Sequence, residues 1–176
     1  MKNKQRIFSF LQLIIAVGLL TGFDQWTKFL AVENLKGKAD IPLIPNVLYL
    51  QYLENRGAAF GIFQDQKIFL ILLTSFILIG VCYVLWKIPS DKKYIYLKML
   101  CFLITAGGIG NLIDRVRLDY VIDFIYFAPI DFPVFNVADI YVSVGMIFLF
   151  IVVLFYYKDE DFEFLKWKSK SKSKGV

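Results

Sequence analysis

The chain has 176 residues, of which 58% are hydrophobic and 18% aromatic, with a mean hydropathy of +0.60 and a formal net charge of +5. Such a composition argues against a soluble domain, and the clustering of its apolar residues indicates membrane-spanning helices. The sequence contains no histidine, which excludes Ser-His-Asp and Cys-His sites and any histidine-ligated metal. It also has no metal-ligand spacing and no phosphate-cradling glycine loop, so we expect neither a metal nor a cofactor.

Four apolar stretches are long enough to cross a bilayer as helices, at roughly 17–25 residues each. They cover about residues 7–23 (continuing to 32), 68–86, 94–113 and 137–157. The first stretch is read as a retained helix and not as a signal peptide, because no small-x-small cleavage site follows it. We therefore predict an α-helical polytopic membrane protein, with one membrane-embedded domain over residues 1–158 and a charged cytoplasmic tail over 159–176.

Lysine and arginine gather at both termini and in the short segment between the second and third stretches. The positive-inside rule places these three regions in the cytoplasm and the two other connections outside. The net charge is thus a topology signal, and no nucleic-acid partner is expected, because the terminal Ser-Lys repeat lacks interleaved aromatic residues. We expect that repeat to be a disordered arm near anionic lipid.

At the outer end of the first stretch, Asp24 and Lys28 are four residues apart. On a helix they share a face and can form an ion pair. The favoured interpretation is a pair that closes the helix at the membrane interface. An anchor for the outer loop or for substrate is the alternative.

Residues 41–63 change character, because Pro42 and Pro45 break any helix and a strand-like segment follows over 47–52. The next segment, residues 54–61, has two glycines flanking small residues, which permits tight bends and close approach of another chain. We predict a small extended platform on the outer membrane surface. Its glycine segment is either a structural turn or a ledge that binds substrate.

The third stretch ends in a polar group of Asn111, Asp114 and Arg115, spaced so that all three can project to one side. Three polar groups exceed what interface anchoring requires, so a functional role is favoured. Glycines at 107, 108 and 110 would let neighbouring helices pack closely there, although the strict GxxxG spacing is missing.

Three aspartates, Asp123, Asp131 and Asp139, have apolar neighbours on both sides. A carboxylate with poor solvation is costly unless it is paired, neutralised or used. Two that met in space would repel when ionised, so one would hold a proton near neutral pH, as in aspartic peptidases. The flanking Pro129 and Pro133 suggest that Asp131 lies in an exposed loop, but the residues alone leave three candidates for two places.

Five motifs occur in order along the chain, and together they resemble the motif set of bacterial lipoprotein signal peptidase (signal peptidase II). They are Asp24-x-x-x-Lys28, Asn55-x-Gly57-Ala58-Ala59-Phe60-Gly61, Gly107-Gly108-x-x-Asn111-x-x-Asp114-Arg115, Val121-x-Asp123-Phe124 and Phe135-Asn136-x-Ala138-Asp139. The resemblance implies that Asp123 and Asp139 are the catalytic pair. It also implies eight residues that shape or support the site: Asp24, Lys28, Asn55, Gly57, Asn111, Asp114, Arg115 and Asn136.

This resemblance implies four transmembrane helices, a small extracytoplasmic β-like platform and an outer loop between the third and fourth helices. The implied activity is that of an intramembrane aspartic endopeptidase. It would remove the signal peptide from diacylglyceryl-modified prolipoproteins, cutting before the lipidated cysteine at the outer face of the bacterial cytoplasmic membrane. The expected partners are prolipoprotein substrates and membrane lipid, and we expect a monomer.

Three alternatives stand beside this function. A proton- or ion-coupled transporter would use membrane acids as a relay, but here the acids gather at one end of the spans. A non-catalytic scaffold that binds lipoproteins is the second. A serine–lysine hydrolase is formally possible, although Ser75 and Ser143 lie in spans without a lysine at helical spacing.

Overall fold

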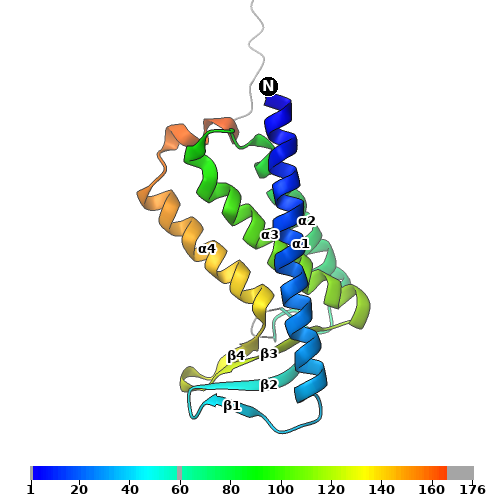
Figure 1. Ribbon diagram of the computed structural model, residues 1–176. Coiled ribbons are helices and arrows are strands. Elements are labelled where there is room, and N and C mark those ends of the chain that lie inside the picture. Colours follow the sequence, from blue (N-terminus) through cyan, green and yellow to red (C-terminus); the bar gives the residue numbers. More distant parts are fainter. Residues whose placement is uncertain (1, 59–60, 166–176) are drawn as a thin grey trace, which may run out of the picture.

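The computed structural model describes residues 2–58 and 61–165 and shows a helical body with a small sheet at one end (Figure 1). The long helices are α1 (Lys2–Leu35), α2 (Lys67–Lys87), α3 (Ile95–Leu118) and α4 (Val137–Phe155). The strands are β1 (Ile41–Ile44), β2 (Leu48–Asn55), β3 (Val121–Phe127) and β4 (Phe132–Phe135). Short 3-10 helices are η2 (Lys92–Tyr94), η3 (Ala128–Ile130) and η4 (Asp159–Leu165).

Within the described residues, four helices are long and apolar enough to cross a membrane, which confirms the predicted spans. Helix α3 is central, and α1, α2 and α4 all pack against it. The outward faces of the other helices are apolar and uncovered, as Leu19 (72% exposed), Phe76 (75%) and Phe155 (83%) illustrate. These faces are suited to lipid, since an apolar side chain gains nothing from facing water.

Two helices are longer than the sequence predicts. Helix α1 runs without a break through Asp24 and Lys28, as expected, and ends at Leu35, three residues beyond the expected end at residue 32. Helix α3 extends five residues beyond the expected end at residue 113. The additional residues of both helices include polar ones, which lower the local hydropathy. A prediction based on apolar runs therefore ends these helices too early.

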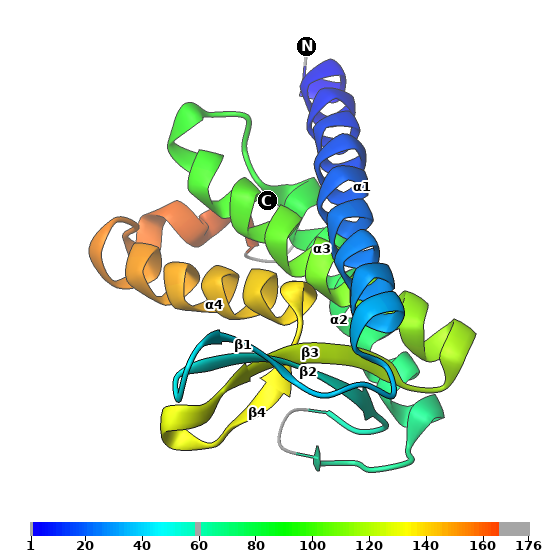
Figure 2. The same cartoon turned by 60° about the horizontal axis from the view of Figure 1, so that its bottom comes forward.

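The sheet is antiparallel with strand order β1-β2-β3-β4 (Figure 2). Strand β2 contains the segment predicted as a strand except for its first residue, Val47, which lies in the preceding turn. The connection between α3 and α4, expected as an outer loop, instead supplies β3 and β4. The register pairs Leu53 with Asp123 and Asn55 with Val121. Asn55 and Asp123 are therefore diagonal neighbours on one face of the sheet.

Two hydrophobic clusters hold the elements together. One lies among the four helices and includes Leu100 and Ala106 of α3. The other joins Ala31 and Leu35, in the last two turns of α1, to Ile122 and Phe124 of β3. The C-terminal end of α1 therefore supports the sheet.

The first part of the charged C-terminal segment packs on the helices at the end opposite the sheet (Figure 1). Asp161 of η4 forms an ion pair with Lys93, 2.6 Å apart, and its carbonyl accepts a hydrogen bond from the Tyr94 hydroxyl. Phe162 and Phe164 pack against the helical cluster. The Ser-Lys repeat expected to be disordered lies outside the described residues.

Candidate active site

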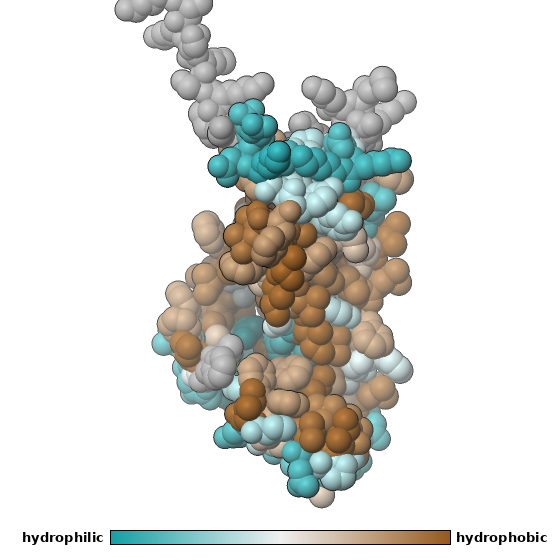
Figure 3. All heavy atoms as spheres, turned by 90° about the vertical axis from the view of Figure 1, so that its left-hand side faces the viewer, coloured by the Kyte–Doolittle hydropathy of each residue, from teal (hydrophilic) through white to brown (hydrophobic). Residues whose placement is uncertain are grey.

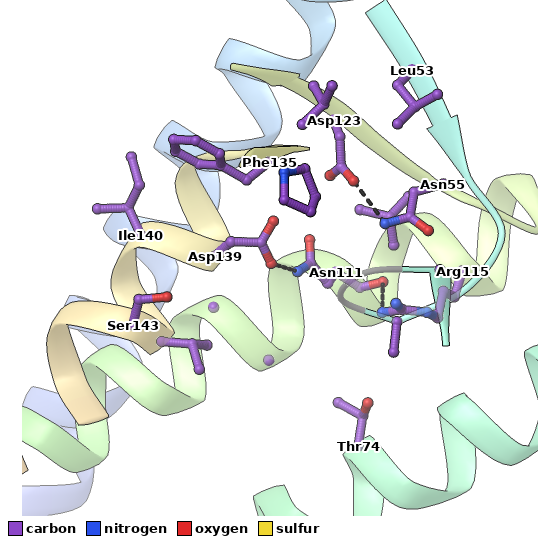
Figure 4. A pocket seen from close by; sticks show the side chains of 18 of the residues that line it. Leu53, Asn55, Thr74, Asn111, Arg115, Asp123, Phe135, Asp139, Ile140 and Ser143 are labelled. Atoms are coloured by element: carbon purple, nitrogen blue, oxygen red, sulfur yellow. Dashed lines mark hydrogen bonds between the residues drawn. The ribbon is translucent and has the colours of Figure 1, made fainter. Parts of the chain in front are cut away.

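A cavity of about 950 Å³ lies between the sheet and helices α2, α3 and α4, and both Asp123 and Asp139 line it (Figure 4). Seen from the side, the surface here is hollowed, with hydrophilic residues inside and hydrophobic ones at the rim (Figure 3). The third candidate, Asp131, lies outside this cavity, at the turn between β3 and β4. It is exposed and accepts a hydrogen bond of 2.8 Å from the Tyr126 hydroxyl. The exposed loop position expected for Asp131 is confirmed.

Asp123 sits on β3 with 1% of its surface exposed. Its Oδ2 accepts a 2.8 Å hydrogen bond from the Asn55 side-chain amide, and its Oδ1 accepts one of 2.6 Å from that of Asn136. Burial is the largest cause that raises the pKa of Asp123, to about 7, and the negative charge of Asp139 is the second. The hydrogen bonds from the two asparagine amides act in the opposite direction and lower this pKa. Asp123 therefore holds a proton close to neutral pH.

Asp139 lies in the first turn of α4, where Asn136 caps the helix. The Asn136 backbone N–H donates to Asp139 Oδ2 (3.1 Å), and the Asp139 N–H donates to Asn136 Oδ1 (3.0 Å). This reciprocal capping box fixes the start of the helix and the direction of the Asp139 side chain. The Asn111 amide donates to the remaining oxygen, Oδ1, at 2.8 Å.

A buried ionic cluster lies behind the cavity. Lys28, with 1% of its surface exposed, places its Nζ 3.0 Å from Asp24 Oδ2 and 2.9 Å from Asp114 Oδ2. The predicted Asp24–Lys28 pair is confirmed, but its favoured interpretation is wrong. The pair lies inside the protein and does not close α1 at an interface.

Among residues 2–58 and 61–165, no three acidic or cysteine side chains are arranged to hold a metal ion.

The two carboxylates of this cluster also hold the backbone beside the cavity aspartates. Asp24 Oδ1 accepts a 2.9 Å hydrogen bond from the N–H of Ala138, the residue before Asp139. Asp114 Oδ2 accepts one of 3.2 Å from the N–H of Ile122, the residue before Asp123. The cluster therefore fixes the position of the backbone immediately before each of the two cavity aspartates.

Gln25 belongs to this cluster and is not among the residues that the sequence motifs indicate. Its side-chain amide donates to Asp114 Oδ1 at 2.9 Å and to the Gly110 carbonyl at 3.2 Å, with a longer contact of 3.3 Å to Asp24 Oδ2. The available signal was a polar amide next to Asp24 in a membrane-spanning helix, where a polar side chain requires partners.

Arg115 binds a different part of the site. Its Nη2 donates to the Gly57 carbonyl at 2.9 Å, and its Nη1 contacts the Asn111 carbonyl at 3.4 Å. The Gly57 N–H in turn donates to Asn55 Oδ1 at 2.9 Å. The three polar residues at the end of α3 therefore do not project to one side, because Asp114 faces α1 while Arg115 holds the loop after β2. A Cβ at Gly57 would lie 2.9 Å from the Ile62 carbonyl, so this close approach requires glycine.

Comparison with known proteins identifies the relatives of this chain. Residues 13–155 match the family model described as signal peptidase (SPase) II. A lipoprotein signal peptidase of Streptococcus thermophilus (strain CNRZ 1066) is 44% identical over 135 residues, covering 77% of this chain and 87% of that protein. One from Clostridium tetani (strain Massachusetts / E88) is 43% identical over 142 residues, covering 79% and 88%.

The fold has solved counterparts as well. A bacterial membrane enzyme structure determined by the in meso method at 2.3 Å resolution superposes with a TM-score of 0.73 and 31% identity, over 90% of this chain and 93% of that one. A second such structure, at 1.9 Å resolution, gives a TM-score of 0.71. The family model covers most of this sequence, and the matched regions cover most of the length of each relative. The chain therefore belongs to the signal peptidase II family of membrane peptidases that process prolipoproteins.

Proposed function

We propose that Asp123 and Asp139 are the catalytic pair with which this chain cleaves signal peptides from lipid-modified prolipoproteins. The observation that carries the proposal is their convergence on one cavity from different elements, β3 and α4. Each carboxylate accepts hydrogen bonds from asparagine side-chain NH₂ groups, two at Asp123 and one at Asp139. A pair so arranged can keep one proton and one negative charge, which is the requirement for general acid–base hydrolysis.

The chemistry divides between the two residues by environment. Asp123, with its raised pKa, is the protonated partner, and Asp139, in the first turn of α4 where the helix dipole favours a negative charge, is the ionised one. Asp139 takes a proton from water as the water oxygen attacks the scissile carbonyl carbon, and Asp123 gives its proton to the carbonyl oxygen. When the intermediate collapses, the C–N bond breaks, Asp139 protonates the departing amine, and Asp123 recovers its proton from the hydroxyl.

The shape of the cavity suits an apolar, membrane-embedded substrate. Its walls include Ile77 of α2 and Val144 and Ile147 of α4, which are also 48–63% exposed on the outer surface of the helices. The cavity therefore reaches the lipid-facing side between α2 and α4. The apolar segment of a signal peptide and the acyl chains of a modified cysteine can approach by this route without crossing water.

The topology follows from the same arrangement. The sheet and the two aspartates lie at the end of the helices opposite the N-terminus and the Lys92–Tyr94 turn (Figure 1). With both termini in the cytoplasm, as the charge distribution predicts, the active site is near the outer face of the cytoplasmic membrane. The membrane-embedded domain then includes η4, which packs on the helices, and we expect it to act as a monomer in contact with lipid.

The test is cleavage of a diacylglyceryl-modified precursor by purified protein, comparing wild type with Asp123→Asn and Asp139→Asn. Each replacement removes the acid or the base, so the rate should fall by about 10²–10⁴-fold. Asp131→Asn is the matched control, because this exposed aspartate lies outside the cavity, and its rate should be unchanged. A folded Asp123→Asn or Asp139→Asn variant that cleaves at nearly the wild-type rate would refute the pair. Proton flux through the protein in sealed vesicles would instead support the transporter.

A further inference from the structure

Three asparagine side chains surround the two aspartates, and each directs its NH₂ group at a carboxylate. Asn55 and Asn136 donate to Asp123, and Asn111 donates to Asp139. A side-chain amide has a donor side and an acceptor side that differ little in shape. If any of these amides turned over, its oxygen would face a carboxylate oxygen and repel it. Something must therefore fix the orientation of each amide.

Backbone N–H groups fix two of the three. The oxygen of Asn55 accepts from the Gly57 N–H at 2.9 Å, and the oxygen of Asn136 accepts from the Asp139 N–H at 3.0 Å. A backbone N–H can only donate, so the amide oxygen must face it and the NH₂ group must face the other way. The local fold alone therefore sets these two orientations.

Asn111 is held differently, because its oxygen faces the ammonium group of Lys28 at 2.8 Å. The same oxygen accepts a weaker bond of 3.1 Å from the Asn136 amide. An ammonium carries three N–H donors and no acceptor, and Lys28 has three oxygen partners: Asp24, Asp114 and Asn111. A reversed Asn111 would place NH₂ against the ammonium and oxygen against Asp139.

We propose that Lys28 is a positioning residue for catalysis, which locks the Asn111 amide so that its N–H points at Asp139. This inference rests on the proposed role of Asp139. Lys28 is buried behind Asn111 and is not among the residues that line the cavity. Its effect on the reaction passes through Asn111, and this separates it from a lysine that merely neutralises two buried acids.

The matched pair Lys28→Met and Lys28→Gln tests the lock. Both side chains are neutral and of similar length, and both leave Asp24 and Asp114 without their cation, so both should lose stability to a similar degree. Only glutamine carries an N–H donor for Asn111. We expect kcat of Lys28→Met to fall about 10²-fold with KM nearly unchanged, and Lys28→Gln to retain at least about tenfold more activity. Lys36→Met is the control, because Lys36 lies just after the end of the same helix and forms an exposed ion pair with Glu54.

A second variant tests the amide direction with Lys28 in place. In Asn111→Asp, a carboxylate oxygen can still accept from Lys28, but no N–H remains for Asp139. We expect the folded variant to lose about 10²-fold in kcat. Thermal unfolding in detergent verifies the fold of each variant. If Lys28→Met is not recovered folded, Asn111→Asp decides the matter.

The outcomes separate this inference from the catalytic assignment. An inactive Asp139→Asn, together with equal activities of Lys28→Gln and Lys28→Met, would overturn the lock and leave the catalytic pair intact. Wild-type activity in Asn111→Asp would do the same. An active Asp139→Asn would overturn the pair itself.

Discussion

The pKa of Asp123 predicts how both activity and stability depend on pH. Burial and the charge of Asp139 raise it to about 7, so the aspartate carries its proton below that pH and loses it above. Since the proposed mechanism requires the proton on Asp123, kcat/KM should decline as the pH rises through about 7. An ordinary aspartate, with a pKa near 4, would give no such decline in this range.

The effect on stability has a definite sign. In the unfolded chain the Asp123 carboxyl ionises near pH 4, whereas in the folded protein it stays protonated to about pH 7. The folded state therefore binds the extra proton between these values, and the free energy of unfolding falls by about 1.4 kcal/mol per pH unit. From pH 5 to pH 7 the loss is about 2–3 kcal/mol, or roughly 5–10 °C in Tm for a chain of this size.

The assay is thermal unfolding in detergent from about pH 5 to pH 8 for wild type and Asp123→Asn, together with the pH profile of kcat/KM on a lipidated peptide. The absence of histidine leaves this range free of the side chain that ordinarily titrates in it. The variant should lack the decline in Tm, so the Tm of the wild type should fall relative to that of the variant as the pH rises. Parallel Tm curves, or a rate that stays flat from pH 6 to pH 9, would refute the reasoning.

Two further substitutions test the packing around the site. Gly110→Ala would place a Cβ 2.5 Å from Asp24 Oδ2, which its hydrogen bonds hold in place. We therefore expect the free energy of unfolding to fall by about 1–3 kcal/mol, measured by thermal unfolding. Gly22→Ala is the control, because the space around its Cβ is open, and it should be neutral or slightly stabilising. Arg115→Ala removes the donor from the Gly57 carbonyl and should lower activity or the yield of folded protein. Arg117→Ala should do neither, because Arg117 is exposed. Unchanged activity in Arg115→Ala would reduce the role of Arg115 to that of an interface anchor.

The helical part of the fold could be predicted because its signals are local. Apolar runs locate all four spans, and the predicted start of the last at residue 137 agrees with α4, whose capping pair Asn136 and Asp139 is visible in the sequence. Strands β3 and β4 could not be found in this way. The segment Val121–Phe127 is an apolar run without alternation, because its first four residues are buried on both faces. Its pairing with β2 joins residues about 70 apart, which no local pattern reveals.

The sequence motifs indicate most residues of the site, although not Gln25, and they do not indicate its geometry. Spacing alone indicates the pair of Asp24 and Lys28, which the structure confirms. It cannot show that Asp114 and Asn111 arrive from another helix to complete the coordination of the ammonium. The opposite directions of Asp114 and Arg115 are equally hidden, because neighbouring helical positions point about 100° apart and their partners are set by tertiary packing.

The hydrogen bonds of the buried ionic cluster explain why this membrane enzyme retains three buried charges whose desolvation opposes folding. A well-packed apolar substitute is often as stable as a buried ion pair, or more so, so stability alone does not account for Lys28 and its two carboxylates. Their hydrogen bonds, however, end on the main chain immediately before each cavity aspartate, at Ala138 and Ile122. Apolar side chains could fill the same space, but they would leave those two N–H groups without partners and would remove the ammonium donor from the Asn111 oxygen. The cluster is therefore best understood as a device for orienting the site, with its cost in stability offset by the hydrophobic packing of the surrounding helices.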